Sequence, residues 1–263
     1  MQKADGQDSI VSLERGLEVL RAFHNESTAL GIHDLMRATG LPKATVARLA
    51  HTLVTLGYLE QTHFQGRYHL ADRVIDIGNA ALANISITRV ATPILQEVAD
   101  RFNMSTALGA ADRTDMVYLA YCRGKDTVTL RLQVGALVPM HLTAMGRAHI
   151  WALSPEARAA CLERIRRSGA DMGAVQALLD EAFAEIDATG FCMSRGDWRP
   201  DIYAVAVPLV INDGQTVLAL NCGVSRHGLS ASTFREEIGP ALLVAARNIA
   251  NTMADLKLKF FAA

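Results

Sequence analysis

The chain has 263 residues, of which 50% are hydrophobic and 20% are charged, so it can bury a sizeable core and is not compositionally disordered. This length favours two domains over one. The formal net charge of −1 excludes a protein whose whole surface is a basic nucleic-acid-binding patch. Any contact with nucleic acid must therefore come from a local arrangement of residues.

The sequence indicates a soluble, cytoplasmic protein with no membrane partner. Its longest apolar stretch, residues 203–211, has nine residues, whereas a membrane-spanning helix needs roughly 20. Residues 1–16 are polar and acidic, but a secretory signal has a basic start followed by an apolar run.

The sequence predicts no metal site and no cofactor. It contains no C-x-x-C pair and no H-E-x-x-H pattern. The cysteines have mostly apolar neighbours, which favours buried thiols over a redox or metal site. These residues are Cys122, Cys161, Cys192 and Cys222.

The first 71 residues predict three helices followed by a two-stranded hairpin. The first helix is indicated by apolar residues that recur every three or four positions and so share one face: Leu13, Leu17, Leu20 and Phe23. Gly40 and Pro42 supply a helix stop and a helix start for the elements that follow. The predicted helices cover residues 12–24, 32–39 and 42–56, and the hairpin covers residues 58–70. This order is typical of a winged helix-turn-helix domain over residues 1–71.

The third predicted helix has an outward face that suits the major groove of DNA. Small residues on it permit close approach, Arg48 and His51 can donate to base edges, and Lys43 and Thr45 can reach phosphates. An ordinary solvated helix face is the alternative interpretation, and the neighbouring hairpin, with His63 and Arg67 near its turn, favours DNA. The predicted DNA-binding residues are Lys43, Ala44, Thr45, Arg48, His51 and Arg67.

Charge balance predicts that this domain acts in pairs. Residues 1–71 contain seven basic and seven acidic residues. Because the electrostatic part of DNA affinity grows with the number of phosphates contacted, a neutral module needs a second copy on a second half-site. We therefore expect a homodimer or a dimer of dimers that binds double-stranded DNA.

The rest of the chain predicts a connecting helix over residues 72–84 and an α+β domain over residues 85–263. Strands are predicted over residues 106–111, 116–122, 127–134, 203–210 and 215–224. Helices are predicted over residues 88–102, from 144 onward, and over 155–167, 172–189 and 233–257, the last one starting with a capping box at Thr233 and Glu236. Strands in two groups flanked by helices favour a central antiparallel sheet covered on one face.

One corner of the second domain could bind a carboxylate. Residues 135–148 run from a strand end into a helix N-terminus, where free backbone N–H groups can hold an anion; a tightly packed corner is the alternative. Asn221 lies in the middle of an apolar strand, so it needs either a ligand or a buried backbone group as a partner. The loop at Trp198 is either a pocket rim or an ordinary surface loop.

Four segments in this order resemble the IclR family of bacterial transcriptional regulators: SLERGLEVLRAF, TGLPKATVARLAHTLVTLGYLE, GRYHLADRVIDIG and VPMHLTAMGRAHIWAL. The resemblance covers about residues 12–253. It implies a DNA-binding domain, a linker helix and a C-terminal effector domain related to GAF and PAS-like sensors. It also implies that the protein assembles as dimers or dimers of dimers, binds a small organic acid and controls catabolic genes, including those for aromatic compounds.

The resemblance further implies a set of effector-binding positions. By position they are Leu130, Leu132, Val138, Ala144, Met145, Gly146, Ser194, Ala204, Asn221 and Gly223. Trp198, from the loop described above, completes the predicted effector-binding set. In a glyoxylate- and pyruvate-responsive member, polar side chains occupy four positions, which align here with Ser194, Ala204, Asn221 and Gly223. Three of these four lack the acid, thiol or hydroxyl of that member, so a larger or more aromatic acid is expected. The DNA-reading helix departs from the family at Ala44, where many members carry a hydroxyl group.

Two other classes of function compete with a regulator. An enzyme with a helical N-terminal appendage is one, but the G-x-S-x-G, G-x-x-x-x-G-K and G-x-G-x-x-G patterns do not occur and no nucleophile can be named. A protein-interaction adaptor that uses the winged helix is the other. The sequence favours a ligand-responsive, DNA-binding transcriptional regulator that is not an enzyme.

Overall fold

The computed structural model describes residues 10–24, 29–62, 66–83, 85–125, 132–212, 214–225 and 231–256. The chain divides into two compact units, which we call the N-terminal unit (Met1–Ala81) and the C-terminal unit (Leu82–Ala263). Each unit has its own hydrophobic core. Among the described residues, no helix is both long and apolar enough to span a bilayer.

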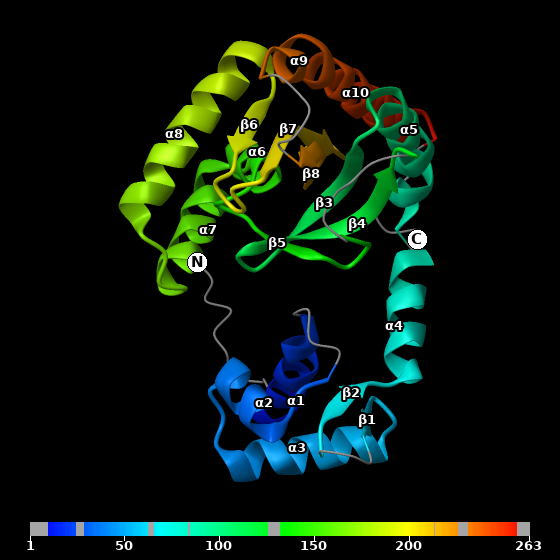
Figure 1. The fold of residues 1–263 in the computed structure, drawn as a ribbon, viewed down its shortest axis with the longest axis vertical. Coiled ribbons are helices and arrows are strands. Elements are labelled where there is room, and N and C mark those ends of the chain that lie inside the picture. Colours follow the sequence, from blue (N-terminus) through cyan, green and yellow to red (C-terminus); the bar gives the residue numbers. More distant parts are fainter. Residues whose placement is uncertain are drawn as a thin grey trace. The chain divides into compact units, whose positions relative to one another are not determined.

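The N-terminal unit has the predicted order of helices followed by a hairpin (Figure 1). Its elements are α1 (Val11–Arg21), the 3-10 helix η1 (Ala22–His24), α2 (Ile32–Thr39), α3 (Lys43–Thr55), β1 (Leu59–Gln61) and β2 (Tyr68–Leu70). Helix α4 (Asp72–Ala83) begins in this unit and ends in the next. Its core joins side chains from the first three helices and both strands: Val19, Leu30, Leu35, Val46, Ala50, Leu53, Leu59 and Tyr68. The predicted winged helix-turn-helix is therefore confirmed.

The apolar stripe predicted for α1 is only partly a core face. Leu13 and Leu17 are 60% and 52% exposed, while the fully buried residue of the helix is Val19. Leu20 and Phe23 pack against the core at its edge. The helix therefore turns a different side to the core than its leucine spacing indicated.

The C-terminal unit is built on a six-stranded antiparallel sheet with the strand order β5-β4-β3-β8-β7-β6. The strands are β3 (Ser105–Asp112), β4 (Asp115–Arg123), β5 (Leu137–Pro139), β6 (Cys192–Arg195), β7 (Ile202–Ile211) and β8 (Thr216–Ser225). The helices are α5 (Ser86–Phe102), α6 (Ala144–Ala152), α7 (Pro155–Arg167), α8 (Met172–Thr189), α9 (Ala231–Thr233), the π-helix η2 (Phe234–Ile238) and α10 (Gly239–Asp255).

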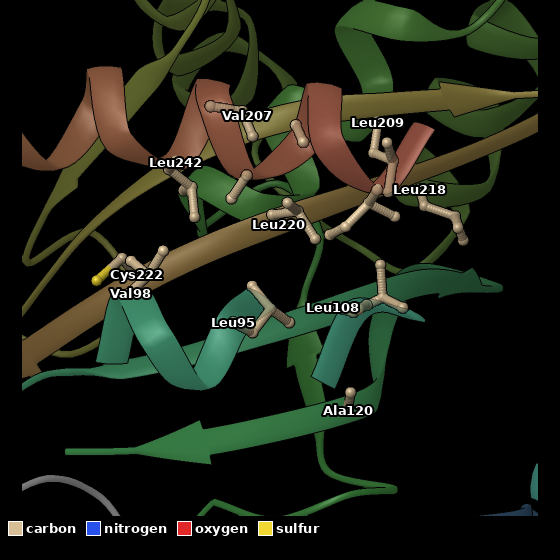
Figure 2. Packing of buried hydrophobic residues seen from close by; sticks show 14 of the residues in the cluster. Leu95, Val98, Leu108, Ala120, Val207, Leu209, Leu218, Leu220, Cys222 and Leu242 are labelled. Atoms are coloured by element: carbon tan, nitrogen blue, oxygen red, sulfur yellow. The ribbon is translucent and has the colours of Figure 1, made fainter. Parts of the chain in front are cut away.

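Helices cover both faces of this sheet, whereas the sequence predicted one covered face. Along β7, Val205 and Val207 belong to the cluster formed with α5 and α10, while Ala204 and Ala206 belong to the cluster formed with α6, α7 and α8. Figure 2 shows the first cluster, in which side chains of α5 and α10 meet those of the strands. A strand that is apolar on both sides is typical of burial on both faces, and residues 203–211 are such a run.

Three further predictions differ from the structure. The strand expected at residues 127–134 lies mostly outside the described residues, its described end belongs to no strand, and the strand of this region is β5. Strand β6 was not predicted. The capping box at Thr233 does not form, because the helix has already begun at Ala231 and Thr233 itself is helical, with φ −56° and ψ −41°.

The cysteines are buried and unpaired, as predicted. Cys192 donates from its Sγ atom to the carbonyl oxygen of Ala144 at 3.4 Å, just behind the start of α6. Burial raises the pKa of this thiol to about 12. It is therefore a packing group and not a reactive thiolate.

Candidate functional site

Helix α3 presents a contiguous exposed face on the N-terminal unit. Lys43, Ala44, Arg48 and His51 are exposed, and Thr45 is half-buried at the edge of the face. The opposite side of the helix is anchored in the core by three buried residues: Val46, Ala50 and Leu53. The sequence thus places a short side chain, a guanidinium and an imidazole on one surface, as a helix that enters the major groove requires.

The turn before α3 fixes its direction. Gly40 has φ +69°, a left-handed conformation that favours glycine, and its N–H donates to Met36 O at 2.8 Å. The Asp34 side chain accepts a hydrogen bond from the N–H of Gly31 at 3.0 Å and so closes the start of α2. Backbone geometry at Gly40, side-chain hydrogen bonds of Asp34 and Thr39, and the shared core therefore hold α2 and α3 at a compact turn.

Arg67, predicted to contact DNA from the hairpin, makes hydrogen bonds within the N-terminal unit, and its side chain stays 41% exposed. Its guanidinium donates to Ala29 O at 3.2 and 2.8 Å and to Asp34 Oδ2 at 3.3 Å. The side chain therefore ties the start of β2 to α2. His63 lies outside the described residues.

A pocket with about 620 Å³ of empty space, part of it open to solvent, lies in the C-terminal unit, against the sheet face that carries α6. It is lined by Ser105, Thr106, Tyr118, Tyr121, Leu132, Val138, Thr143, Ala144, Ser194, Trp198, Ile202, Ala204, Asn221, Gly223 and Val224. Within the described part of the chain, none of these lining side chains carries a charge. Small residues on the strands leave room above the sheet; Ala204, for example, pairs with Gly223 across β7 and β8.

One wall of the pocket carries two tyrosines that a β-bulge brings to the same face. The register between β3 and β4 shifts, so that Leu108 pairs with Ala120 and Gly109 pairs with Tyr118, which leaves Leu119 as the extra residue. The rings of Tyr118 and Tyr121 are stacked with centroids 6.1 Å apart. Without the bulge, two residues three positions apart would point to opposite faces.

The tyrosine hydroxyls belong to a polar cluster of uncharged groups. Tyr121 shares a hydrogen bond of 3.0 Å with Ser105 Oγ, and Asn221 Nδ2 donates to the Tyr118 hydroxyl at 3.4 Å. Burial raises the pKa of Tyr118 to about 12, so the phenol stays neutral. Asn221 thus has a side-chain partner inside the pocket.

The start of α6 forms another side of the pocket. Thr143 is the N-cap residue, and its hydroxyl accepts from Gly146 N at 3.3 Å and donates to Pro139 O at 2.8 Å. The N–H groups of Ala144 and Met145 occupy the first helical positions, which have no acceptor within a helix. Such N–H groups, with the helix dipole, attract a negatively charged group.

Met145 and Gly146 shape the pocket without lining it. A Cβ atom on Gly146 would lie 2.0 Å from the carbonyl oxygen of Met140, so only glycine permits this close approach. The Met145 side chain packs over Gly109, where a Cβ atom would lie 2.2 Å from its sulfur. Both residues are buried. They therefore affect the pocket indirectly, by fixing where α6 begins.

A buried ion pair joins α6 to the loop that carries Trp198. Arg147 is 1% exposed, and it donates to a carboxylate oxygen of Asp197 and, at 3.4 Å, to the carbonyl oxygens of Leu142 and Thr143. Trp198 follows directly and lines the pocket. The loop is therefore attached to the helix end whose first N–H groups have no acceptor within the helix.

The structure brings most of the predicted effector-binding positions to this pocket. Those that line it are Leu132, Val138, Ala144, Ser194, Trp198, Ala204, Asn221 and Gly223, and Leu130 lies outside the described residues. Sequence reasoning missed Ser105, Thr106, Tyr118, Tyr121, Thr143, Ile202 and Val224. Strand alternation could have indicated Tyr118, but no sequence pattern marks the bulge that adds Tyr121. No group of potential metal ligands occurs in the described ranges.

Comparison with known proteins identifies both units. Residues 12–63 match the model of the IclR helix-turn-helix domain, and residues 79–251 match that of the bacterial transcriptional regulator IclR C-terminal domain. The HTH-type transcriptional regulator TsaQ1/TsaQ2 of Comamonas testosteroni is 30% identical over 240 residues, which cover 90% of this chain and 86% of that protein.

Solved structures agree with these matches. The crystal structure of an IclR family transcriptional regulator from Brucella abortus is similar with a TM-score of 0.85 and 37% identity, and the match covers 96% of each chain. An IclR homologue from Microbacterium hydrocarbonoxydans, complexed with 4-hydroxybenzoate, shares the fold with a TM-score of 0.71 and 21% identity, over 93% of this chain and 99% of that one. The matched proteins are regulators and not enzymes, and this chain belongs to the IclR family of bacterial transcriptional regulators.

Proposed function

We propose that this protein is a cytoplasmic regulator that binds operator DNA through α3 of paired subunits and responds to a ring-bearing organic acid in the pocket. The pocket itself carries this proposal: its lining side chains are uncharged within the described residues, and it includes the start of α6. A carboxylate would accept a hydrogen bond from the backbone N–H of Ala144, which lines the pocket at the start of α6.

The walls of the pocket favour a ring over a short aliphatic acid. Trp198, Tyr121 and Leu132 offer flat or apolar surface, and aromatic rings prefer such neighbours. Ala204 and Gly223 lack long side chains, so space remains that a two-carbon acid would leave empty. Support also comes from the IclR homologue of the same fold that was crystallised with 4-hydroxybenzoate.

Effector binding would act on DNA affinity through a difference between two arrangements of the subunits. A ligand shifts such an equilibrium only if it binds one arrangement more tightly. Helix α4 (Asp72–Ala83) is the segment through which we expect this shift to pass.

The first test is a calorimetric titration of the full-length protein with benzoate and with glyoxylate. We expect benzoate to bind and to change the affinity for the DNA upstream of the protein's own gene, and glyoxylate not to bind. Binding of glyoxylate alone would contradict a ring-bearing effector. Turnover of either acid would revive the enzyme alternative.

We propose that the DNA-binding form is a homodimer or a dimer of dimers. The first 71 residues have balanced charge, so a single N-terminal unit gains little from phosphate neutralisation. Leu13 and Leu17 place an exposed apolar stripe on α1, and such a surface is stabilised when another protein surface covers it. Both observations support pairing of subunits.

Replacing Arg48 by alanine should weaken specific DNA binding by about 10- to 100-fold, since one base contact is worth about 1–3 kcal/mol. Arg15→Ala is the matched control, because it removes the same charge from an exposed position on α1. Fluorescence anisotropy with duplexes of one and two half-sites measures both effects. If the two variants lose DNA affinity equally, Arg48 does not make a base contact. If Arg48→Ala leaves the DNA affinity unchanged and a complex with a partner protein intact, the protein-interaction adaptor is favoured.

A further inference from the structure

The polar groups of the pocket gather on one wall and carry no charge. Ser105 lies on β3, Tyr118 and Tyr121 on β4, and Asn221 on β8, and we call these four residues the neutral cluster. Ala107 pairs with Tyr121 on one side and with Asn221 on the other. The short side chain of Ala107 therefore lets groups from three adjacent strands meet.

In the neutral cluster, the Tyr118 hydroxyl accepts a hydrogen bond but donates none to the described residues. Tyr118 is 5% exposed, and its hydroxyl oxygen accepts from Asn221 Nδ2 at 3.4 Å. Among the described residues, no acceptor receives the Tyr118 proton. A buried donor without an acceptor destabilises the structure that contains it. Because its raised pKa of about 12 keeps the phenol protonated at neutral pH, the donor is always present.

We propose that the neutral cluster binds an uncharged hydroxyl oxygen on the effector, so that the effector is a hydroxylated ring acid and not a dicarboxylate. This proposal rests on the function proposed above, since it takes the carboxylate of the ligand to lie at the start of α6. The ligand hydroxyl would accept the proton of Tyr118 and donate its own to an oxygen of the cluster.

The absence of charge on this wall decides against a second acidic group. A second carboxylate would leave water for a site whose described lining offers no cation, and burial of an unpaired charge is strongly unfavourable. A ring acid without a hydroxyl group would bind less tightly than a hydroxylated one, because it leaves the Tyr118 proton without an acceptor. Sites built to hydrogen-bond a hydroxyl discriminate well against analogues that lack it.

The test is a calorimetric titration of the full-length protein with benzoate, the three monohydroxybenzoates and terephthalate. One hydroxybenzoate should bind about 10-fold more tightly than benzoate, the size expected for one hydrogen bond to a buried donor. Terephthalate should bind more weakly than benzoate. In Tyr118→Phe the affinity advantage of the hydroxybenzoate over benzoate should disappear.

Tyr203→Phe is the matched control. Tyr203 packs against the hydrophobic cluster formed with α5 and α10, on the opposite face of the sheet, and does not line the pocket. This substitution should leave the whole ligand series unchanged. The ranking of ligands by the unmodified protein tests the proposal independently of the stability of Tyr118→Phe.

Two results would overturn the proposal in different ways. If benzoate binds as tightly as every hydroxybenzoate, or if Tyr118→Phe weakens all ligands equally, the neutral cluster does not read a hydroxyl while a ring acid remains the effector. If none of the five acids binds, a ring-bearing acid is not the effector. The proposal that the neutral cluster binds a hydroxyl group of such an acid is then wrong as well.

Discussion

Gly146→Ala is expected to destabilise the C-terminal unit by about 3 kcal/mol and to abolish effector binding. Its Cβ atom would lie 2.0 Å from the carbonyl oxygen and 2.4 Å from the Cα atom of Met140, so backbone must move in a fully buried region. Overpacking of a core typically costs about 1–3 kcal/mol, and contact with backbone places this site at the upper end. Urea unfolding monitored by circular dichroism would measure the change.

Gly78→Ala is the matched control for this variant. Gly78 lies in α4, and a Cβ atom there meets nothing within 4 Å. Alanine in an exposed helix should stabilise by about 0.5–1 kcal/mol relative to glycine. If Gly146→Ala unfolds at the same urea concentration as the unmodified protein, the close approach of Met140 to α6 does not support the fold as described.

Asp197→Ala should cost about 3 kcal/mol of unfolding free energy and weaken effector binding at the same time. It leaves the guanidinium of Arg147, which is 1% exposed, without the anionic partner it has in the structure. Loss of one member of a buried ion pair typically costs about 3–5 kcal/mol, and we take the lower end because Asp197 keeps 26% of its side chain exposed. The loop with Trp198 also loses its attachment to α6.

A double-mutant cycle separates the ion pair from simple loss of packing. Arg147→Met combined with Asp197→Ala removes both charges, so the double variant should recover part of the stability that Asp197→Ala loses. Effector binding can be followed by the fluorescence of Trp198 in a Trp151→Phe background, because the chain has two tryptophans. A cost below about 1 kcal/mol for Asp197→Ala would show that solvent screens the pair.

The sequence predicted helices well where a residue fixes an end by its own chemistry. Helix α2 ends at the left-handed Gly40, and α7 begins with Pro155 after the capping residue Ser154. Such signals depend on one or two residues and survive in any tertiary setting. Thr233 shows the limit, because the same kind of signal fails once the helix begins before it.

Predictions that depend on distant contacts were less complete. Arg67 could be recognised as a basic residue beside a turn, but its partners, Ala29 and Asp34, lie more than 30 positions away in the chain. Leu13 and Leu17 have core-like spacing, yet the side of α1 that meets the core is set by α2 and α3. The site shows the same division: Asn221 was noticed as a polar residue in an apolar strand, and its partner Tyr118 was not.

Because of the bulge at Leu119, the geometry of the pocket depends on the number of residues in β4 as well as on their types. Leu119 and Ala120 both face the cluster under α5 and α10, so Tyr118 and Tyr121 both face the pocket. Deletion of Leu119 would place the two tyrosines two positions apart in a regular strand. Both rings would then still face the pocket, but closer together along a straighter strand. The width of this pocket can therefore be changed by insertion or deletion of one residue in β4, with every lining side chain kept.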